Sequence, residues 1–344
     1  MPFGRAGKKL SKRWISMNAL KRFLNNGDIS RFRLWFQLGA FVLLMYGGLL
    51  ALDISNSVPA FSCVFADSRA GACYLYPLQH QVNMPWSQFT GGRGIGLLSG
   101  LVTFFLLFIL FNKAWCGFAC PLGTVQDWIT KLRARLKIRF SLYGDDTFQR
   151  LKAIKYVLLA LLILLPLGIG NSFFGLPKLP RDLATSYCMI CPGRTVLPLF
   201  TGDASQLAID FSSKTMTVLT GLGMSITGLF LVGVFVKKRF FCFFCPMSAL
   251  QYAFSKAGLL RLTKKGAKCT RCGNCSRACD VGIREIADDV TSTNIVQDDC
   301  MMCFKCVAVC PEERCLTVTF LGMPVYEATA EGFMKRAKRR DVNG

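Results

Sequence analysis

Eight cysteines in the last quarter of the chain stand in two runs with one spacing, C-x2-C-x2-C-x3-C. The first run consists of Cys269, Cys272, Cys275 and Cys279, and the second of Cys300, Cys303, Cys306 and Cys310, which Pro311 follows. The 20 residues from 280 to 299 separate the two runs. Such spacing lets one tight loop hold three thiolates against an inorganic cluster, while the fourth cysteine of each run binds the other cluster.

This spacing predicts two [4Fe–4S] cubanes in a domain of the bacterial ferredoxin type. We expect the ligands of one cubane to be Cys269, Cys272, Cys275 and Cys310. We expect the ligands of the other to be Cys279, Cys300, Cys303 and Cys306. Zinc is the alternative, but four-cysteine zinc sites usually pair two C-x2-C knuckles across about 15–20 residues, whereas each run here holds four cysteines. Asp280 stands where the second run has Pro311, which predicts a different turn but the same ligation.

Most of the chain before these runs is apolar enough for a membrane. Apolar residues make up 52% of the sequence. Four stretches, over residues 34–54, 95–111, 154–169 and 218–236, approach the roughly 20 residues with which a helix crosses about 30 Å of hydrocarbon. We therefore expect a mainly α-helical membrane protein with four transmembrane helices, followed by a C-terminal α+β ferredoxin-like domain with two [4Fe–4S] clusters.

The same patterns divide the chain into four predicted parts. A basic N-terminal segment covers residues 1–33, and the four-span membrane domain covers 34–262. The ferredoxin domain covers 263–322, and a basic tail covers 323–344. Residues 10–24 alternate basic and apolar side chains, which fits either a helix lying on the membrane surface or an unstructured basic tail.

The basic residues predict the orientation of the spans. The net charge is +22, which often indicates nucleic-acid binding, but here the basic residues flank apolar stretches, where they set topology and meet anionic lipid. Segment 1–33 holds nine Lys or Arg, segment 113–155 holds nine, and the chain after 236 holds eighteen; loops 55–94 and 170–217 hold two and four. By the positive-inside rule, both termini and the ferredoxin domain are cytoplasmic in a multi-pass protein of the bacterial inner membrane.

A second cysteine motif occurs twice in the membrane domain. Its copies read Cys116-Gly-Phe-Ala-Cys120-Pro121 and Cys242-Phe-Phe-Cys245-Pro246. Cys120 and Cys245 are 125 residues apart, and so are Gln126 and Gln251. Each copy follows an apolar stretch and precedes an amphipathic basic segment. The repeat therefore predicts two helix pairs related by a pseudo-two-fold axis along the membrane normal.

The Cys-Pro step in each copy has a physical use. Proline is favoured at the first position of a helix, and the positive end of that helix stabilises a thiolate on the preceding cysteine. Two such helix ends offer the four thiolates of Cys116, Cys120, Cys242 and Cys245. We expect them to hold a further iron–sulfur cluster, of [2Fe–2S] or [4Fe–4S] type, at the cytoplasmic membrane face. The alternative is four free cysteines that pack as small apolar side chains.

Four more cysteines lie in the predicted outer loops, namely Cys63, Cys73, Cys188 and Cys191. Cys63 and Cys188 are again 125 residues apart, and Pro192 follows Cys191. A metal cluster, disulfides and free thiols are all compatible with this position, because the outer side of the membrane permits disulfides. The remaining Cys315 is expected only to pack. The single histidine, His80, excludes a haem held by two histidines of this chain.

Paired Cys-Pro motifs followed by a double cysteine run make the chain resemble the NapH/MauN-type membrane ferredoxins, and NosR and CcoG share parts of that arrangement. The resemblance covers residues 31–320. It implies an electron-transfer or maturation subunit of an anaerobic or periplasmic respiratory system, beside a quinol and a periplasmic ferredoxin or cytochrome. Two features depart from the family: the second inner motif has two intervening residues where three are usual, and the four outer cysteines are extra.

The function that we expect is one-electron transfer between a cytoplasmic or quinol donor and an acceptor at or across the inner membrane. The chain would then be a subunit of an oxidoreductase complex, not a stand-alone enzyme. Its partners would be membrane lipid and other redox subunits, not nucleic acid. One alternative is a redox sensor or maturation factor for a periplasmic metalloenzyme. Another is a membrane metal-ion reductase, which needs a substrate site near Cys63 and Cys188.

Overall fold

The computed structural model describes residues 29–51, 62–138, 151, 153–171 and 179–335 of the 344-residue chain. The surface helix considered over residues 10–24 lies outside this part. Contacts divide the chain into two compact units. The larger unit is Phe36–Lys256, and the smaller unit combines Met1–Trp35 with Ala257–Gly344.

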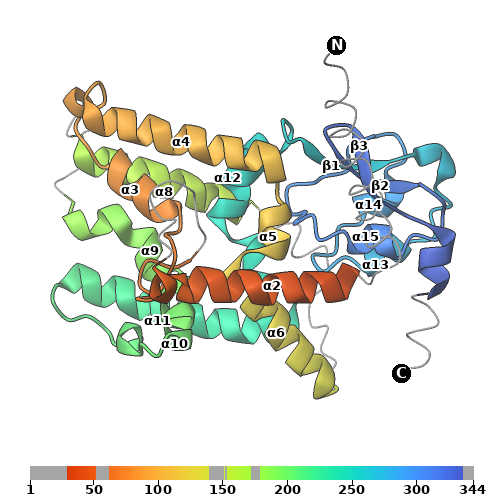
Figure 1. Cartoon of the computed structure of the whole chain (residues 1–344). Coiled ribbons are helices and arrows are strands. Elements are labelled where there is room, and N and C mark those ends of the chain that lie inside the picture. Colours follow the sequence, from red (N-terminus) through yellow and green to blue (C-terminus); the bar gives the residue numbers. More distant parts are fainter. Residues whose placement is uncertain (1–28, 52–61, 139–150, 152, 172–178, 336–344) are drawn as a thin grey trace, which may run out of the picture. The chain divides into compact units, whose positions relative to one another are not determined.

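Three helical segments of the described chain are long and apolar enough to cross a membrane. The first is α2 (Ile29–Tyr46) with the 3-10 turn η1 (Gly47–Leu50), and the others are α4 (Gly92–Phe111) and α11 (Lys214–Val236) (Figure 1). Helix α8 (Ile154–Gly170) is also apolar but has only 17 residues. At 1.5 Å per residue it rises about 25 Å, somewhat less than the hydrocarbon thickness of about 30 Å. Three of the four predicted spans therefore have full length.

Many apolar side chains of these helices point outward. Leu98 on α4 and Val218 and Leu229 on α11 are more than 60% exposed. Exposed apolar area on this scale is unusual for a protein surface in water and typical of one that faces lipid. The amino-acid sequence thus places the apolar side chains on both sides of each long helix, and only part of them packs inside the unit.

Short helices connect the long ones and carry the cysteines. They are α3 (Leu75–Val82), η2 (Trp86–Gln88), α5 (Ala114–Phe118), α6 (Pro121–Arg135), η4 (Arg181–Thr185), α9 (Ser186–Ile190), α10 (Pro192–Phe200), η5 (Ser205–Leu207), η6 (Phe240–Phe243) and α12 (Pro246–Ser255). Helix α12 packs against α4 and α8, whereas α6 and α10 pack against α11. Prolines begin α6, α10 and α12, as expected where the first N–H has no partner in the helix.

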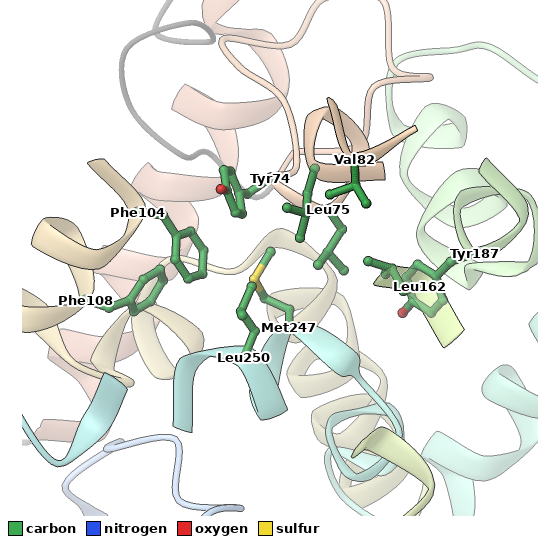
Figure 2. Packing of buried hydrophobic residues seen from close by; sticks show 10 residues of the cluster. Tyr74, Leu75, Val82, Phe104, Phe108, Leu162, Tyr187, Met247 and Leu250 are labelled. Atoms are coloured by element: carbon green, nitrogen blue, oxygen red, sulfur yellow. The ribbon is translucent and has the colours of Figure 1, made fainter. Parts of the chain in front are cut away.

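The core of the larger unit is aromatic and includes cysteines. Tyr74 stacks on Phe104 with ring centroids 4.4 Å apart, and Figure 2 shows these rings opposite Met247, with Tyr187 beyond it. Such pairs contribute about 0.5–1.5 kcal/mol each beyond their buried area. Cysteines of both predicted sets pack against this core and a second one around Phe230, so the thiols lie in the interior of the unit.

The smaller unit contains a three-stranded antiparallel sheet in the order β1-β2-β3. The strands are β1 (Leu260–Lys264), β2 (Leu316–Phe320) and β3 (Met323–Glu327). Leu321 and Gly322 both have positive φ and join β2 to β3 in a two-residue turn, the geometry that suits the twist of a hairpin. Strand β3 lies within the segment that the sequence assigned to the tail from residue 323.

Both cysteine runs lie in the chain between β1 and β2, and the helices of this segment are short. These are η7 (Gly266–Lys268), α13 (Asn274–Arg277), α14 (Glu285–Asp288) and α15 (Lys305–Ala308). Residues Leu260 and Phe320 pair across β1 and β2, so the sheet closes the loop that holds the runs. Helices α13 and α15 contact each other. The sheet therefore serves as a platform for the cysteine loops.

Candidate metal centres

The two cysteine runs of the smaller unit have the same backbone. Gly273, with φ +73°, follows the second cysteine of the first run, and Phe304, with φ +61°, follows the second cysteine of the second run. Arg271 and Met302, one residue before those cysteines, also have positive φ. A non-glycine residue in this region carries a conformational cost. One such residue in the first loop and two in the second indicate that each loop turns tightly around its cysteine side chains. The repeat in spacing is thus a repeat in structure.

The fourth cysteine of the first run lies with the second run. Cys279, Cys300, Cys303 and Cys306 line one small cavity. A charge on Cys279 interacts with Cys303 and Cys306, and burial is the main cause that raises the pKa of Cys279 to about 11. These are the four cysteines that the spacing assigned to one cubane.

The converse arrangement holds for the first run. Cys310 interacts electrostatically with Cys272 and Cys269, and Cys275 interacts with Cys310 and Cys272. The structure therefore places the fourth cysteine of the second run beside the first three cysteines of the first run. Four thiols from two segments are the donor set of an iron–sulfur cluster. Within the described residues, no three His, Cys, Asp or Glu side chains converge with the geometry of a single-ion site.

Asp280 explains the departure from proline in the first run. Its carboxylate is 4% exposed and receives Lys305 Nζ at 2.5 Å and Arg33 Nη1 at 3.2 Å. Arg33 is the fifth residue of α2, and Lys305 begins α15. A buried carboxylate requires such partners. The residue after Cys279 thus ties three segments of the smaller unit together instead of shaping a turn.

Cys315 does more than the packing that the sequence predicted. It is 2% exposed and interacts electrostatically with Cys310 and Cys269. Its sulfur is also 3.8 Å from the carbonyl oxygen of Lys265. A fifth sulfur therefore borders the first candidate cluster. No spacing signal marks it, because it reaches the site through the sheet and not through the cysteine loop.

In the larger unit, the two Cys-Pro motifs meet. Cys120 caps α6, where its sulfur accepts the Gly123 N–H at 3.4 Å, and Cys245 precedes Pro246 at the start of α12. Cys116 lies on α5 and Cys242 on η6. Electrostatic interactions link all four thiols. We call Cys116, Cys120, Cys242 and Cys245 the inner quartet.

Burial and buried charge act in opposite directions on the inner quartet. Burial raises the pKa of Cys116 to about 12 and that of Cys120 to about 11. Lys113 lowers the pKa of Cys116, and Arg239 lowers that of Cys120. Lys113 and Arg239 are each 1% exposed. Buried cations of this kind stabilise negative charge on nearby sulfur, and the site is therefore suited to an anionic thiolate cluster.

Arg239 is held by a paired carboxylate. Its Nη2 and Nε lie 2.6 and 2.8 Å from the two oxygens of Asp127 on α6, and its Nη1 donates to the Cys116 carbonyl oxygen at 3.2 Å. Gln37 on α2 also donates to Asp127 at 2.8 Å. The two-point geometry is available to arginine and not to lysine. The ion pair connects Arg239, which precedes the second Cys-Pro motif, to α6, which follows the first motif.

Two glutamines cross between the copies of the motif. The Cys116 thiol donates to Gln251 Oε1 at 2.7 Å, and Gln126 Nε2 lies 3.9 Å from the Cys242 sulfur. Each glutamine thus contacts the first cysteine of the other copy. The 125-residue repeat in the sequence corresponds to this exchange, although nothing in the spacing alone identified the glutamines as contacts of the thiols.

The four outer cysteines also come together. Cys188 interacts with Cys63 and Cys73, and Cys191 interacts with Cys63. Each of the four carries a free thiol. Cys191 caps α10 ahead of Pro192, the same Cys-Pro arrangement as in the inner quartet. We call Cys63, Cys73, Cys188 and Cys191 the outer quartet.

Polar side chains contact the outer quartet. Gln79 Nε2 on α3 donates to the Cys188 sulfur at 3.1 Å, and the Tyr187 hydroxyl donates to Cys191. His80, the neighbour of Gln79, is exposed and packs its ring on Tyr76 at 4.3 Å. The outer quartet thus receives neutral donors at Cys188 and Cys191, and the charges of Arg69 and Arg194 act on Cys63.

Tyr187 lies between the two quartets. Its side chain is 8% exposed and belongs to the core cluster drawn in Figure 2. Cys73, Cys191 and Cys245 pack against this cluster. The Tyr187 hydroxyl interacts with cysteines of both sets. One aromatic side chain of the larger unit therefore interacts with the outer quartet and with Cys245 of the inner quartet.

Comparison with known proteins agrees with this division. Residues 94–139 and 219–266 each match the family model described as "4Fe-4S binding domain", and these two stretches contain the two Cys-Pro motifs. Residues 261–311 match the model described as "4Fe-4S dicluster domain". No solved structure matches the chain.

Several curated proteins are similar to the chain over more than half of its length. The chain is 25% identical to YccM of Escherichia coli (strain K12), over 75% of this chain and 66% of YccM. It is 27% identical to the ferredoxin-type protein NapH of the same organism, over 63% of this chain and 66% of NapH. It is 26% identical to the regulatory protein NosR of Pseudomonas aeruginosa, over 56% of this chain and 23% of NosR. The chain is therefore similar to NapH- and NosR-type proteins, and it matches 4Fe-4S models over both Cys-Pro motifs and over the double cysteine run.

Proposed function

We propose that the protein transfers single electrons between a cytoplasmic or quinol donor and an acceptor at or across the bacterial inner membrane. It would do so as a subunit of a larger redox complex with ferredoxin, cytochrome or quinol-linked partners. The observation that carries the proposal is the gathering of sixteen cysteines into four sets of four, two in each unit. Iron–sulfur clusters supply one-electron chemistry, with potentials that depend on charge, hydrogen bonds and burial.

In this proposal the smaller unit holds two [4Fe–4S] clusters. Cys269, Cys272, Cys275 and Cys310 hold one, and Cys279, Cys300, Cys303 and Cys306 hold the other. The shared backbone of the two loops and the crossing of the fourth cysteines support this assignment. The Asp280 ion pairs keep α15 and its cysteine loop in register with the first run.

The inner quartet holds a third cluster at the cytoplasmic membrane face. Two helix N-termini, at Cys120 and Cys245, and the buried cations Lys113 and Arg239 all favour negative charge there. These residues hold the thiolates in place and offset their charge, so that neither ligand displacement nor solvent entry accompanies a change of oxidation state.

The outer quartet holds a fourth cluster. Its four thiols are unpaired with one another and interact as one group, which supports metal binding over two separate disulfides. Tyr187 belongs to a core cluster against which Cys245 and Cys191 both pack, which supports a path through packed side chains. An electron arriving at the inner quartet would then have a route toward the outer side.

The membrane topology that accompanies this route has four spans. Helix α8 serves as the fourth, because it is apolar after Lys155 and Tyr156 and packs on α3 and α12 like a member of the bundle. The distribution of Lys and Arg supports a cytoplasmic location for both termini and for the ferredoxin domain. Reporter fusions at residue 140 and at residue 212 test this orientation: the first should report a cytoplasmic position and the second a periplasmic one.

Metal content tests the cofactor assignment. Protein purified without air should contain about sixteen irons if all four sets hold cubanes, and about twelve if each quartet of the larger unit holds a two-iron cluster. Cys120→Ser and Cys245→Ser should each remove one EPR signal and leave the ferredoxin signals intact. About eight irons, together with unchanged spectra in both variants, would overturn the role of the larger unit.

Electron transfer itself is tested by rapid mixing. Reduced ferredoxin or a quinol analogue should reduce the clusters of the protein in vesicles within the turnover time of a respiratory enzyme. A cluster population that stays oxidised with every donor of these two classes would contradict the proposal.

A further inference from the structure

Gln126 and Gln251 are the most deeply buried amides beside the inner quartet. They are 1% and 0% exposed. Each lies on the helix that a Cys-Pro step begins, α6 or α12, and each contacts a cysteine of the opposite copy. Burying an amide costs free energy unless its N–H and C=O groups form hydrogen bonds. The hydrogen bonds of the two glutamines therefore indicate their role at the inner quartet.

The two amides present different atoms to the sulfurs: Gln126 presents its nitrogen and Gln251 its oxygen. Gln126 Oε1 accepts the Phe241 N–H at 3.1 Å, which directs Gln126 Nε2 toward the Cys242 sulfur. Gln251 instead accepts the Cys116 thiol proton through Oε1. Its Nε2 is buried and has no hydrogen-bond partner. Gln126 is therefore set as a donor to sulfur, whereas Gln251 is set as an acceptor with an unused donor.

The contact between Gln251 Oε1 and Cys116 is favourable because the Cys116 thiol has a proton to donate. When a cysteine binds a metal it does so as a thiolate and releases its proton. Cys116 would then have nothing to donate, and Gln251 Oε1 would face a negatively charged sulfur. Rotation of the amide by half a turn exchanges Oε1 and Nε2, which occupy nearly the same volume. The unused Nε2 then donates to the Cys116 sulfur, and the pseudo-equivalent residues become alike.

We propose that Gln251 turns its amide when Cys116 binds metal in place of its proton, and that Gln126 and Gln251 then donate a matched pair of hydrogen bonds to the inner cluster. They are positioning residues, since they contact the ligands and not the reacting metal. This inference rests on the proposed cluster at the inner quartet. Donors to ligand sulfur stabilise the more negative, reduced state, and the pair thus raises the reduction potential of that cluster.

The test is a redox titration of air-free protein, followed by EPR. Gln251→Met keeps the length of the side chain and removes the donor. It should retain all iron and lower the midpoint potential of the signal that Cys120→Ser abolishes. Gln126→Met should lower the same potential, and the double variant should lower it further. Gln79→Met is the matched control, because Gln79 is equally buried and contacts Cys188 of the outer quartet instead; it should leave the inner signal unchanged.

The outcomes separate this inference from the proposed function. Absence of any signal that depends on Cys120 and Cys245 in the parent protein overturns the inner cluster itself. Retained iron with an unchanged potential in both glutamine variants overturns the hydrogen-bond role alone. Loss of iron in both variants assigns the glutamines to assembly of the site and likewise overturns the tuning role.

Discussion

Arg239 occupies the space beside Gly123: a Cβ on residue 123 would lie 2.1 Å from Arg239 Nη1. Arg239 cannot withdraw at low cost, because it is bonded to Asp127 and to the carbonyl of Cys116. Because Gly123 has no side chain, Arg239 of the second repeat can pass close to the first turn of α6 in the first repeat. The buried charge next to the inner quartet depends on this close approach.

Gly123→Ala should displace Arg239 and break its two-point contact with Asp127. Disruption of a buried ion pair costs about 3–5 kcal/mol, and we expect a clear fall in the melting temperature of detergent-solubilised protein. Gly228→Ala on α11 is the control, because nothing lies within 4 Å of a Cβ there. Alanine favours a helix by up to about 1 kcal/mol over glycine, and the control should be neutral or slightly more stable. Equal melting temperatures for the two variants would contradict this prediction.

Asp127→Asn should leave the charge of Arg239 buried without its counterion. The expected results are a loss of stability of about 3–5 kcal/mol and a higher reduction potential of the inner cluster, since an uncompensated cation favours the reduced state. Chemical denaturation and redox titration measure the two effects. Glu331→Gln removes one member of an exposed pair with Lys335 and should change neither quantity. A potential that falls in Asp127→Asn would count against the electrostatic account.

Tyr187→Phe should remove the hydroxyl that donates to Cys191 and keep the ring between the quartets. We expect full iron content, a lower potential for the signal that depends on Cys191, and no change in the signal that depends on Cys120. Potentiometric EPR checks each of these. Tyr187→Ala should in addition lower stability by about 3–5 kcal/mol, the usual cost of deleting a buried aromatic ring. If Tyr187→Phe altered the inner signal alone, Tyr187 would not be a donor to the outer quartet.

Cys315→Ala should retain the eight irons expected of the ferredoxin unit and lower the potential of one cubane only. The reason is that Cys315 interacts with Cys310 but is not a predicted ligand. Cys315→Ser keeps a donor and should restore most of the potential. Cys310→Ser provides the contrast, because it should disturb the cubane of Cys269 and Cys272 directly. Loss of iron in Cys315→Ala would instead make Cys315 a ligand.

Some features of the fold followed from local sequence. The apolar stretches predicted the long helices because a span must satisfy its backbone internally over a set length. The stretch at 154–169 became the 17-residue α8, shorter than a full span, which ends at Gly170 before Asn171. The sequence pattern assigned the residues of β3 to the tail. The five residues from Met323 are too few to show the alternation of a strand, and β3 pairs with β2.

The sequence by itself determined which atoms could bind metal, because thiolate spacing and Cys-Pro steps are local and leave few alternatives. It also determined the 125-residue repeat on which the pairing of the two motifs depends. Tertiary structure alone decided the surroundings of the thiols: the crossing glutamines, the Arg239–Asp127 pair, Tyr187 between the quartets and Cys315 beside the first candidate cluster. The physical reason is that these contacts join residues between 5 and 135 positions apart, so no pattern along the chain records them, and only packing in three dimensions brings them to the sulfur atoms.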